Sequence, residues 1–278
     1  MNLGIARISR RTVTIAVAFA GLVSLVLGAH AALNKRSLDA AKTIATEHTG
    51  SIGQTARVAL VIGNGHYPDA SAPLAQPIND ARGLTAALRG NGFDVDVVED
   101  ATRDDMDRAI ARLKDKIKPD TVVMLFFGGY GVQVGRESFM IPVDARIWKE
   151  ADVRRDGVSI EQVLDAMTEK GAKAKLVVVD ASRRNPYERR FRSYSHGLAP
   201  ISVPENALIL TSATPGKVAD DGNGQYSVLV TELLNNLNSQ SGAATAFNKT
   251  RISVSRASDG EQVPQVSSSL LEDVRIGG

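Results

Sequence analysis

Residues 122–131 read VVMLFFGGYG, a run of apolar residues that ends in a glycine-rich turn. Three similar short runs lie at 58–62, 176–179 and 207–210, and none of them alternates apolar with polar residues. Such runs are typical of strands that are covered on both faces, as in a parallel sheet. Residues 93–98 alternate more and predict a strand nearer the edge of that sheet.

Amphipathic helices are predicted between these runs. Pro77 stands at the first position of one helix, Thr102 is the N-cap of a second, and Ser159 begins a third with a capping box. The apolar stripe of a fourth helix consists of Tyr226, Val230, Leu233 and Leu237. Strands that alternate with helices predict an α/β fold, a three-layer sandwich with a mostly parallel sheet and helices on both faces. Ligands of such sheets bind at the carboxyl ends of the strands.

The N-terminus has the pattern of an export signal. Three arginines precede an uncharged apolar stretch at 13–27, which ends in the small residues Ala29-His30-Ala31. This order predicts a signal peptide over residues 1–31. The alternative is an uncleaved membrane anchor, because the apolar stretch with its flanks is about long enough to span a bilayer. Both interpretations place the rest of the chain in the periplasm, either free or tethered to the inner membrane.

The remaining chain divides into three predicted parts. Residues 32–55 are polar and mixed in charge and predict a tether, 56–271 hold the strand and helix pattern of one domain, and 272–278 form a short tail. The net charge is +2, and the first 31 residues contribute +3, which leaves −1 for the rest. A near-neutral domain lacks the basic face of a nucleic-acid binder, so no nucleic-acid partner is expected.

The chain contains no cysteine. Disulfides, zinc–thiolate sites, iron–sulfur clusters and cysteine nucleophiles are therefore excluded. No group of histidines and acids has the spacing of metal ligands, so neither a metal nor a cofactor is predicted.

Six short motifs occur along the domain, and three of them follow predicted strands, whose carboxyl ends meet at one edge of the sheet. They are ALVIGN at 59–64, NDA at 79–81, FGGYG at 127–131, DASRRNP at 180–186, SATPG at 212–216 and QVP at 262–264. With these motifs in this order, the chain from Ala56 to Leu271 resembles the caspase/metacaspase superfamily, specifically the bacterial caspase-like (peptidase C14) proteins. The resemblance implies a caspase-like three-layer sandwich.

The resemblance also locates the catalytic positions of the family. Its chemistry needs a His-Gly pair after the third strand and Asp-x-Cys after the fourth, and here these positions hold Tyr130 and Ser182. They are 52 residues apart, which agrees with the caspase spacing of about 50 residues. A tyrosine titrates near pH 10 and is a poor base at neutral pH. We therefore expect a pseudoenzyme in which Ser182 is a small residue in the place of the nucleophile.

The alternative is an atypical hydrolase of the same family that uses Ser182. It would need Tyr130, or a histidine recruited from a loop, as the base that activates the serine. His66 and His196 are the candidates outside the signal and tether. A solvent-facing loop histidine is the commoner case for both.

Two acids match the pair that holds a basic substrate side chain in the metacaspase branch, namely Asp80 and Asp180, and Gly131 matches the glycine of the oxyanion hole. The resemblance thus implies that a basic (Arg/Lys) peptide or partner protein binds between the carboxylates in a regulatory role. That binding should weaken below about pH 4, where ordinary carboxylates protonate. The structural alternative is that Asp180 caps a turn and Asp80 stabilises a helix N-terminus.

Residues 183–194 interleave five arginines with three aromatic residues. Such a pattern can contact nucleic acid or anionic lipid. Export of the chain argues against nucleic acid, and a solvated loop is expected here.

Overall fold

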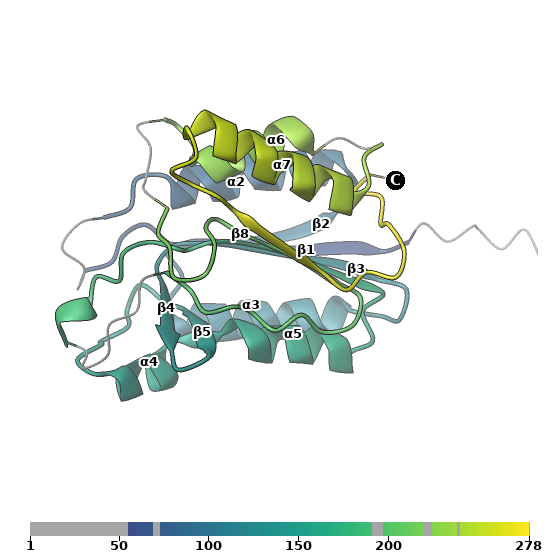
Figure 1. Cartoon of the computed structure of the whole chain (residues 1–278). Coiled ribbons are helices and arrows are strands. Elements are labelled where there is room, and N and C mark those ends of the chain that lie inside the picture. Colours follow the sequence, from purple (N-terminus) through teal and green to yellow (C-terminus); the bar gives the residue numbers. More distant parts are fainter. Residues whose placement is uncertain (1–54, 69–72, 191–196, 220–223, 238–239, 278) are drawn as a thin grey trace, which may run out of the picture. The chain divides into compact units, whose positions relative to one another are not determined.

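The computed structural model describes residues 55–277, except for 69–72, 191–196, 220–223 and 238–239 (Figure 1). The predicted signal peptide, nearly all of the tether and His196 lie outside the described residues. Every helix in the described part of the chain is too short or too polar to cross a membrane.

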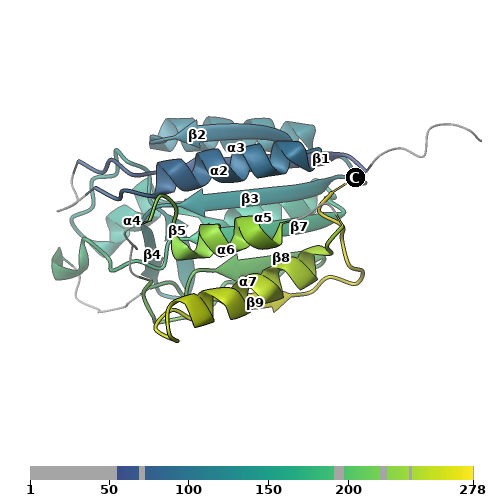
Figure 2. The same ribbon diagram turned by 90° about the horizontal axis from the view of Figure 1, so that it is seen from above.

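A six-stranded sheet forms the centre of the domain, with the strand order β2-β1-β3-β7-β8-β9 (Figure 2). The strands are β1 (Arg57–Gly63), β2 (Asp94–Glu99), β3 (Val122–Gly128), β7 (Ala174–Asp180), β8 (Ala207–Thr211) and β9 (Gln265–Ser268). The first five are parallel to one another, and β9 is antiparallel to β8. The four continuous apolar runs are the four inner strands, and the more alternating segment is the edge strand β2, as predicted.

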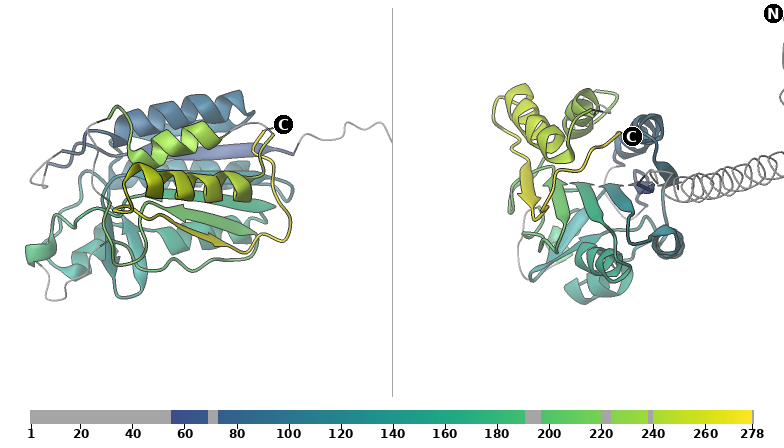
Figure 3. Two further views of the ribbon diagram at one scale, coloured as in Figure 1. Left: turned by 45° about the horizontal axis from the view of Figure 1, so that its top comes forward. Right: turned by 90° about the vertical axis from the view of Figure 1, so that its right-hand side faces the viewer.

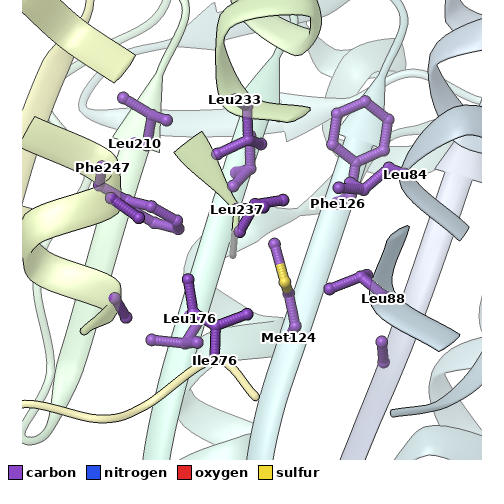
Figure 4. Packing of buried hydrophobic residues seen from close by; sticks show 14 of the residues in the cluster. Leu84, Leu88, Met124, Phe126, Leu176, Leu210, Leu233, Leu237, Phe247 and Ile276 are labelled. Atoms are coloured by element: carbon purple, nitrogen blue, oxygen red, sulfur yellow. The ribbon is translucent and has the colours of Figure 1, made fainter. Parts of the chain in front are cut away.

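Helices cover both faces of this sheet (Figures 1 and 3). One layer consists of α2 (Pro77–Gly90), α6 (Val228–Asn236) and α7 (Ala243–Ala257), and the other of α3 (Arg103–Lys116) and α5 (Ile160–Glu169). Successive side chains of β3 pack alternately against the two helix layers. Phe126 lies beside Leu84 of α2 and Met124 beside Leu88 (Figure 4), whereas Leu125 and Phe127 pack with the opposite layer. Burial on both faces explains the uninterrupted apolar run, and the three-layer prediction is confirmed.

The predicted helix starts are present with one shift. Pro77 is the first residue of α2, and Thr102 and Asp105 form a reciprocal capping box at α3. The fourth helix begins later than its apolar stripe suggested, because Ser227 is the N-cap of α6 and accepts a hydrogen bond from Val230 N–H at 3.1 Å. Tyr226 therefore lies before the helix.

A second, three-stranded sheet stands at the carboxyl end of the central sheet and was not predicted (Figure 2). It contains β4 (Gly131–Val134), β5 (Glu137–Met140) and β6 (Val158–Ser159), with α4 (Glu150–Asp156) beside it.

The final residues differ from the expected tail at 272–278. Ile276 is 1% exposed within the central core, and Gly242 bridges to Arg275. The domain thus continues beyond Leu271.

Candidate active site

The loops after β3 and β7 run side by side. The two strands pair in register up to Gly128 and Asp180. Beyond that pair, Gly129 N–H donates to the carbonyl of Asp180 at 3.3 Å, and Gly131 N–H donates to that of Ala181 at 3.0 Å. The family positions for histidine and cysteine, Tyr130 and Ser182, therefore follow two neighbouring strands, as the sequence predicts.

The backbone amide that the resemblance assigns to the oxyanion hole, Gly131 N–H, and the amide of Ser182 are both engaged within the fold. Gly131 N–H bonds to the Ala181 carbonyl, and Ser182 N–H donates to Ser212 Oγ at 3.3 Å. The packing around Gly131 is close, since a Cβ there would lie 2.6 Å from Leu198 Cδ2 and 2.8 Å from the Ala181 oxygen. The absence of a side chain at Gly131 thus allows the two loops to pack closely. Its N–H donates to the Ala181 carbonyl and is not available to a ligand.

Tyr130 lies in an aromatic cluster. Its ring meets that of Tyr67 edge to face, with centroids 4.9 Å apart, and only 7% of the residue is exposed. The Tyr67 hydroxyl accepts the Tyr130 N–H at 3.1 Å and donates to the Ile141 carbonyl at 3.0 Å. Burial raises the pKa of Tyr67 far above its usual range. The surroundings of Tyr130 are thus those of a packed residue.

Ser182 is 1% exposed, and its carbonyl accepts the N–H of Ala219 at 2.7 Å. It is a buried small residue tied into the fold through its backbone.

His66, the first of the two histidines considered as a replacement base, is exposed and bound to Asp100. Its Nδ1 lies 2.5 Å from Asp100 Oδ2, and its backbone N–H donates to Oδ1 at 3.0 Å. Burial raises the pKa of Asp100, but the hydrogen bonds from His66 and Gly65 outweigh it and lower the pKa. Asp100 follows β2, which stands three strand spacings, about 14 Å, from β7. His66 is thereby held away from Ser182.

The two predicted binding acids are brought together and are buried. Asp80, in the first turn of α2, is 0% exposed and accepts the Ser227 N–H at 2.9 Å; Asp180, at the end of β7, is 2% exposed. The Oδ2 atom of each carboxylate has no hydrogen-bond partner among the described residues. A buried carboxylate oxygen without a hydrogen-bond partner is energetically costly.

Burial, followed by the charge of Asp180, raises the pKa of Asp80 to about 7. The sequence led us to expect both acids to titrate at ordinary values and binding to weaken only below about pH 4. That expectation is wrong for Asp80, because the neighbouring carboxylate and the loss of water act only in the folded state.

Arg183 is the basic residue nearest to this acid pair. It is 5% exposed, and its Nη1 donates to the carbonyls of Gly129, at 3.0 Å, and of Asp180. The same atom lies 3.7 Å from Asp180 Oδ1, and its charge lowers the pKa of Asp80. Sequence reasoning placed Arg183 in a solvated loop, which is wrong. The only feature of the sequence that indicates this contact is the spacing of three residues between Asp180 and Arg183.

Within the described ranges, no three histidine, aspartate or glutamate side chains are grouped so as to hold a metal ion.

Comparison with known proteins gives consistent matches. The family model of the caspase domain, Peptidase_C14, matches residues 56–275, which also agrees with the packing of the final residues. The human mucosa-associated lymphoid tissue lymphoma translocation protein 1 is 29% identical over 133 residues, and its mouse homolog is 30% identical over 143 residues. These segments cover 48% and 51% of this chain but only 16% and 17% of the two relatives.

Solved structures show the same fold. Caspase-1 from Spodoptera frugiperda superposes with a TM-score of 0.58 at 16% identity, over 80% of this chain and 89% of that one. The structure of pro-sf-caspase-1 gives a TM-score of 0.59 at 16% identity, over 82% and 93%.

Proposed function

The chain belongs to the peptidase C14 family of caspase domains, and from that premise we propose that it is a pseudoenzyme. It binds a basic side chain of a peptide or partner protein between Asp80 and Asp180, in a regulatory role, and has no cysteine protease activity. The observation that carries this proposal is the pair of buried carboxylates, each of which has one oxygen without a partner in the described structure.

The absence of turnover follows from what stands in the reactive positions. The chain has no cysteine, and a serine nucleophile needs a nearby base. Tyr130 is packed among aromatic rings, and His66 is bound to Asp100. The Gly131 amide, the candidate for the oxyanion hole, is engaged by the Ala181 carbonyl. Loss of a nucleophile and base costs many orders of magnitude in rate.

The binding proposal follows from charge. A guanidinium or ammonium group placed between two carboxylates forms charge-assisted hydrogen bonds and supplies the partners that both Oδ2 atoms lack. Arg183 already holds a positive charge 3.7 Å from Asp180. An incoming cation meets like-charge repulsion from Arg183, so binding requires that the Arg183 guanidinium moves away from the pair.

In this proposal the domain acts in the periplasm, delivered by residues 1–31 and, if these remain, tethered to the inner membrane. The partner is then an exported protein with an accessible arginine or lysine.

Calorimetric titration tests the binding proposal. The purified chain is titrated at pH 8 with short peptides that end in arginine, in lysine or in citrulline, which is isosteric with arginine but uncharged. The arginine and lysine peptides should bind, and the citrulline peptide should not.

Variants of the protein test the two acids. Asp80→Asn and Asp180→Asn should each lower the affinity by about 1.5–3 kcal/mol, the usual contribution of a charged hydrogen bond. Asp165→Asn, a change at an exposed acid of α5, is the matched control. Equal binding of arginine and citrulline peptides, or indifference to both pair variants, overturns the proposal.

A further inference from the structure

Trp148, the only tryptophan of the chain, is 67% exposed. It lies in the loop between β5 and α4, which crosses the carboxyl end of the central sheet. There Val143 N–H donates to the carbonyl of Ala101, and Ile141 N–H donates to that of Tyr130, each at 3.0 Å. Indole is large and apolar, and here it is exposed near the edge of the sheet at which ligands of such folds bind.

The tryptophan is held rigidly in its exposed position. Its backbone N–H and that of Lys149 donate to Asp152 Oδ2 at 3.0 and 3.1 Å. The guanidinium of Arg190 stacks 4.6 Å from the indole centroid and donates to the Ile147 carbonyl at 2.6 Å. A side chain fixed in this way loses little conformational entropy when a ligand packs on it.

A hollow of about 500 Å³ lies beside the indole. It is lined by Pro68, Val143, Asp144, Ala145, Arg146 and Trp148. Its size is in the range of protein ligand pockets. It shares no residue with the acid pair Asp80 and Asp180.

Two exposed arginines beside this hollow are available to an incoming carboxylate. Arg146 on its wall and Arg189 beside Arg190 are exposed, and neither forms a salt bridge with a described residue. The nearby acids are engaged.

Asp144 accepts Arg103 N–H at 2.9 Å, and Asp152 and Asp156 pair with Arg155. Glu150 also has a partner within the fold. Asp144 still leaves a carboxylate on the wall of the hollow. The phosphates of an anionic membrane surface would be repelled by that carboxylate. A peptide, in contrast, can donate a backbone N–H to it.

We propose that this hollow docks an extended acidic segment of a partner protein. One apolar side chain of the segment packs on Trp148 and Val143, and flanking carboxylates pair with Arg146 and Arg189. This inference does not depend on the proposed function, because the hollow contains neither Asp80 nor Asp180 and its ligand is acidic, whereas the ligand of the acid pair is basic.

Because Trp148 is the only tryptophan, its fluorescence reports the binding directly. The purified chain is titrated with an eight-residue peptide that has one leucine among aspartates and glutamates, and with the same peptide carrying asparagine and glutamine instead. The acidic peptide should shift the emission to shorter wavelength with saturation, and the neutral one should bind at least tenfold more weakly. Affinity should fall with added salt.

Variants and vesicles complete the test. Arg146→Gln should weaken the acidic peptide about five- to tenfold, the effect expected for one charge pair at an interface. Arg256→Gln, which removes an exposed arginine on α7 in the other helix layer, should not change the affinity. Trp148→Ala, followed by anisotropy of a labelled peptide, should weaken binding at least tenfold. Binding of both peptides alike, no binding of either, or a shift seen only with anionic phospholipid vesicles overturns the proposal.

Discussion

The Arg183 guanidinium lies 3.7 Å from the Asp180 carboxylate, and both side chains are almost completely buried. An arginine of the chain itself thus faces the acid pair that we propose as the site of a basic ligand. Asp180 and Asp80 each keep one oxygen without a partner in the described structure, so Arg183 satisfies the pair only in part. We therefore interpret Arg183 as an internal ligand of the pair, with which the proposed basic ligand would have to compete.

Replacement of this internal ligand should favour binding of external ones. In Arg183→Gln, the affinity for arginine- and lysine-ending peptides should rise about tenfold, a change of about 1.4 kcal/mol, because repulsion between like charges is removed. The free energy of unfolding should fall by about 1–3 kcal/mol, since buried hydrogen bonds to two carbonyls are lost. Calorimetric titration and urea unfolding measure the two effects. Unchanged or weaker binding by the folded variant contradicts the internal-ligand assignment.

The stability of the domain should fall as the pH rises from about 4 to 7. Asp80 has a pKa of about 7 in the folded protein and about 3.9 when unfolded. Between these values the folded state binds up to one more proton, so stability decreases by up to about 1.4 kcal/mol per pH unit. Asp80→Asn should remove this slope. Urea unfolding at several pH values measures it, and equal slopes for the two proteins contradict the assignment.

Binding of basic peptides should strengthen as the pH rises through 7. The ligand prefers ionised Asp80, whose pKa is about 7 in the unbound protein. Binding near neutral pH therefore releases a proton, and the measured binding enthalpy should depend on the ionisation enthalpy of the buffer. Asp80→Asn should lose the buffer dependence. Affinity that is constant between pH 6 and 8 argues against a role for Asp80.

Gly131 should tolerate no side chain. A Cβ at this position meets Leu198 and the Ala181 carbonyl oxygen below 3.0 Å, so Gly131→Ala should destabilise the domain by about 1–3 kcal/mol. Gly90, the last residue of α2, has no atom within 4 Å of a built Cβ. Gly90→Ala should stabilise by about 0.5–1 kcal/mol through helix propensity. Thermal unfolding measures the stability of both variants. Equal changes in stability for Gly131→Ala and Gly90→Ala would contradict the importance of the close contacts at Gly131.

The sequence predicts those parts of the structure that depend on local chemistry. Apolar runs locate the inner strands, and Pro77 and Thr102 locate two helix starts, because burial on two faces and capping act over a few residues. The pKa of Asp80 and the burial of Arg183 depend on which loops meet after folding, and no local pattern encodes them. The packing of Ile276 depends likewise on the folded structure, since Val274 and Ile276 in so short a segment predict neither a strand nor a helix.

The most direct test of the pseudoenzyme proposal is turnover. The purified chain and its Ser182→Ala variant are incubated with a series of fluorogenic peptides that end in arginine or lysine, at pH 6 to 8, beside an active protease that cleaves the same peptides. We expect no release of fluorophore above the buffer rate by either protein, and no cleavage of the chain itself. Turnover by the natural sequence that is abolished in Ser182→Ala would contradict the account and identify Ser182 as a working nucleophile.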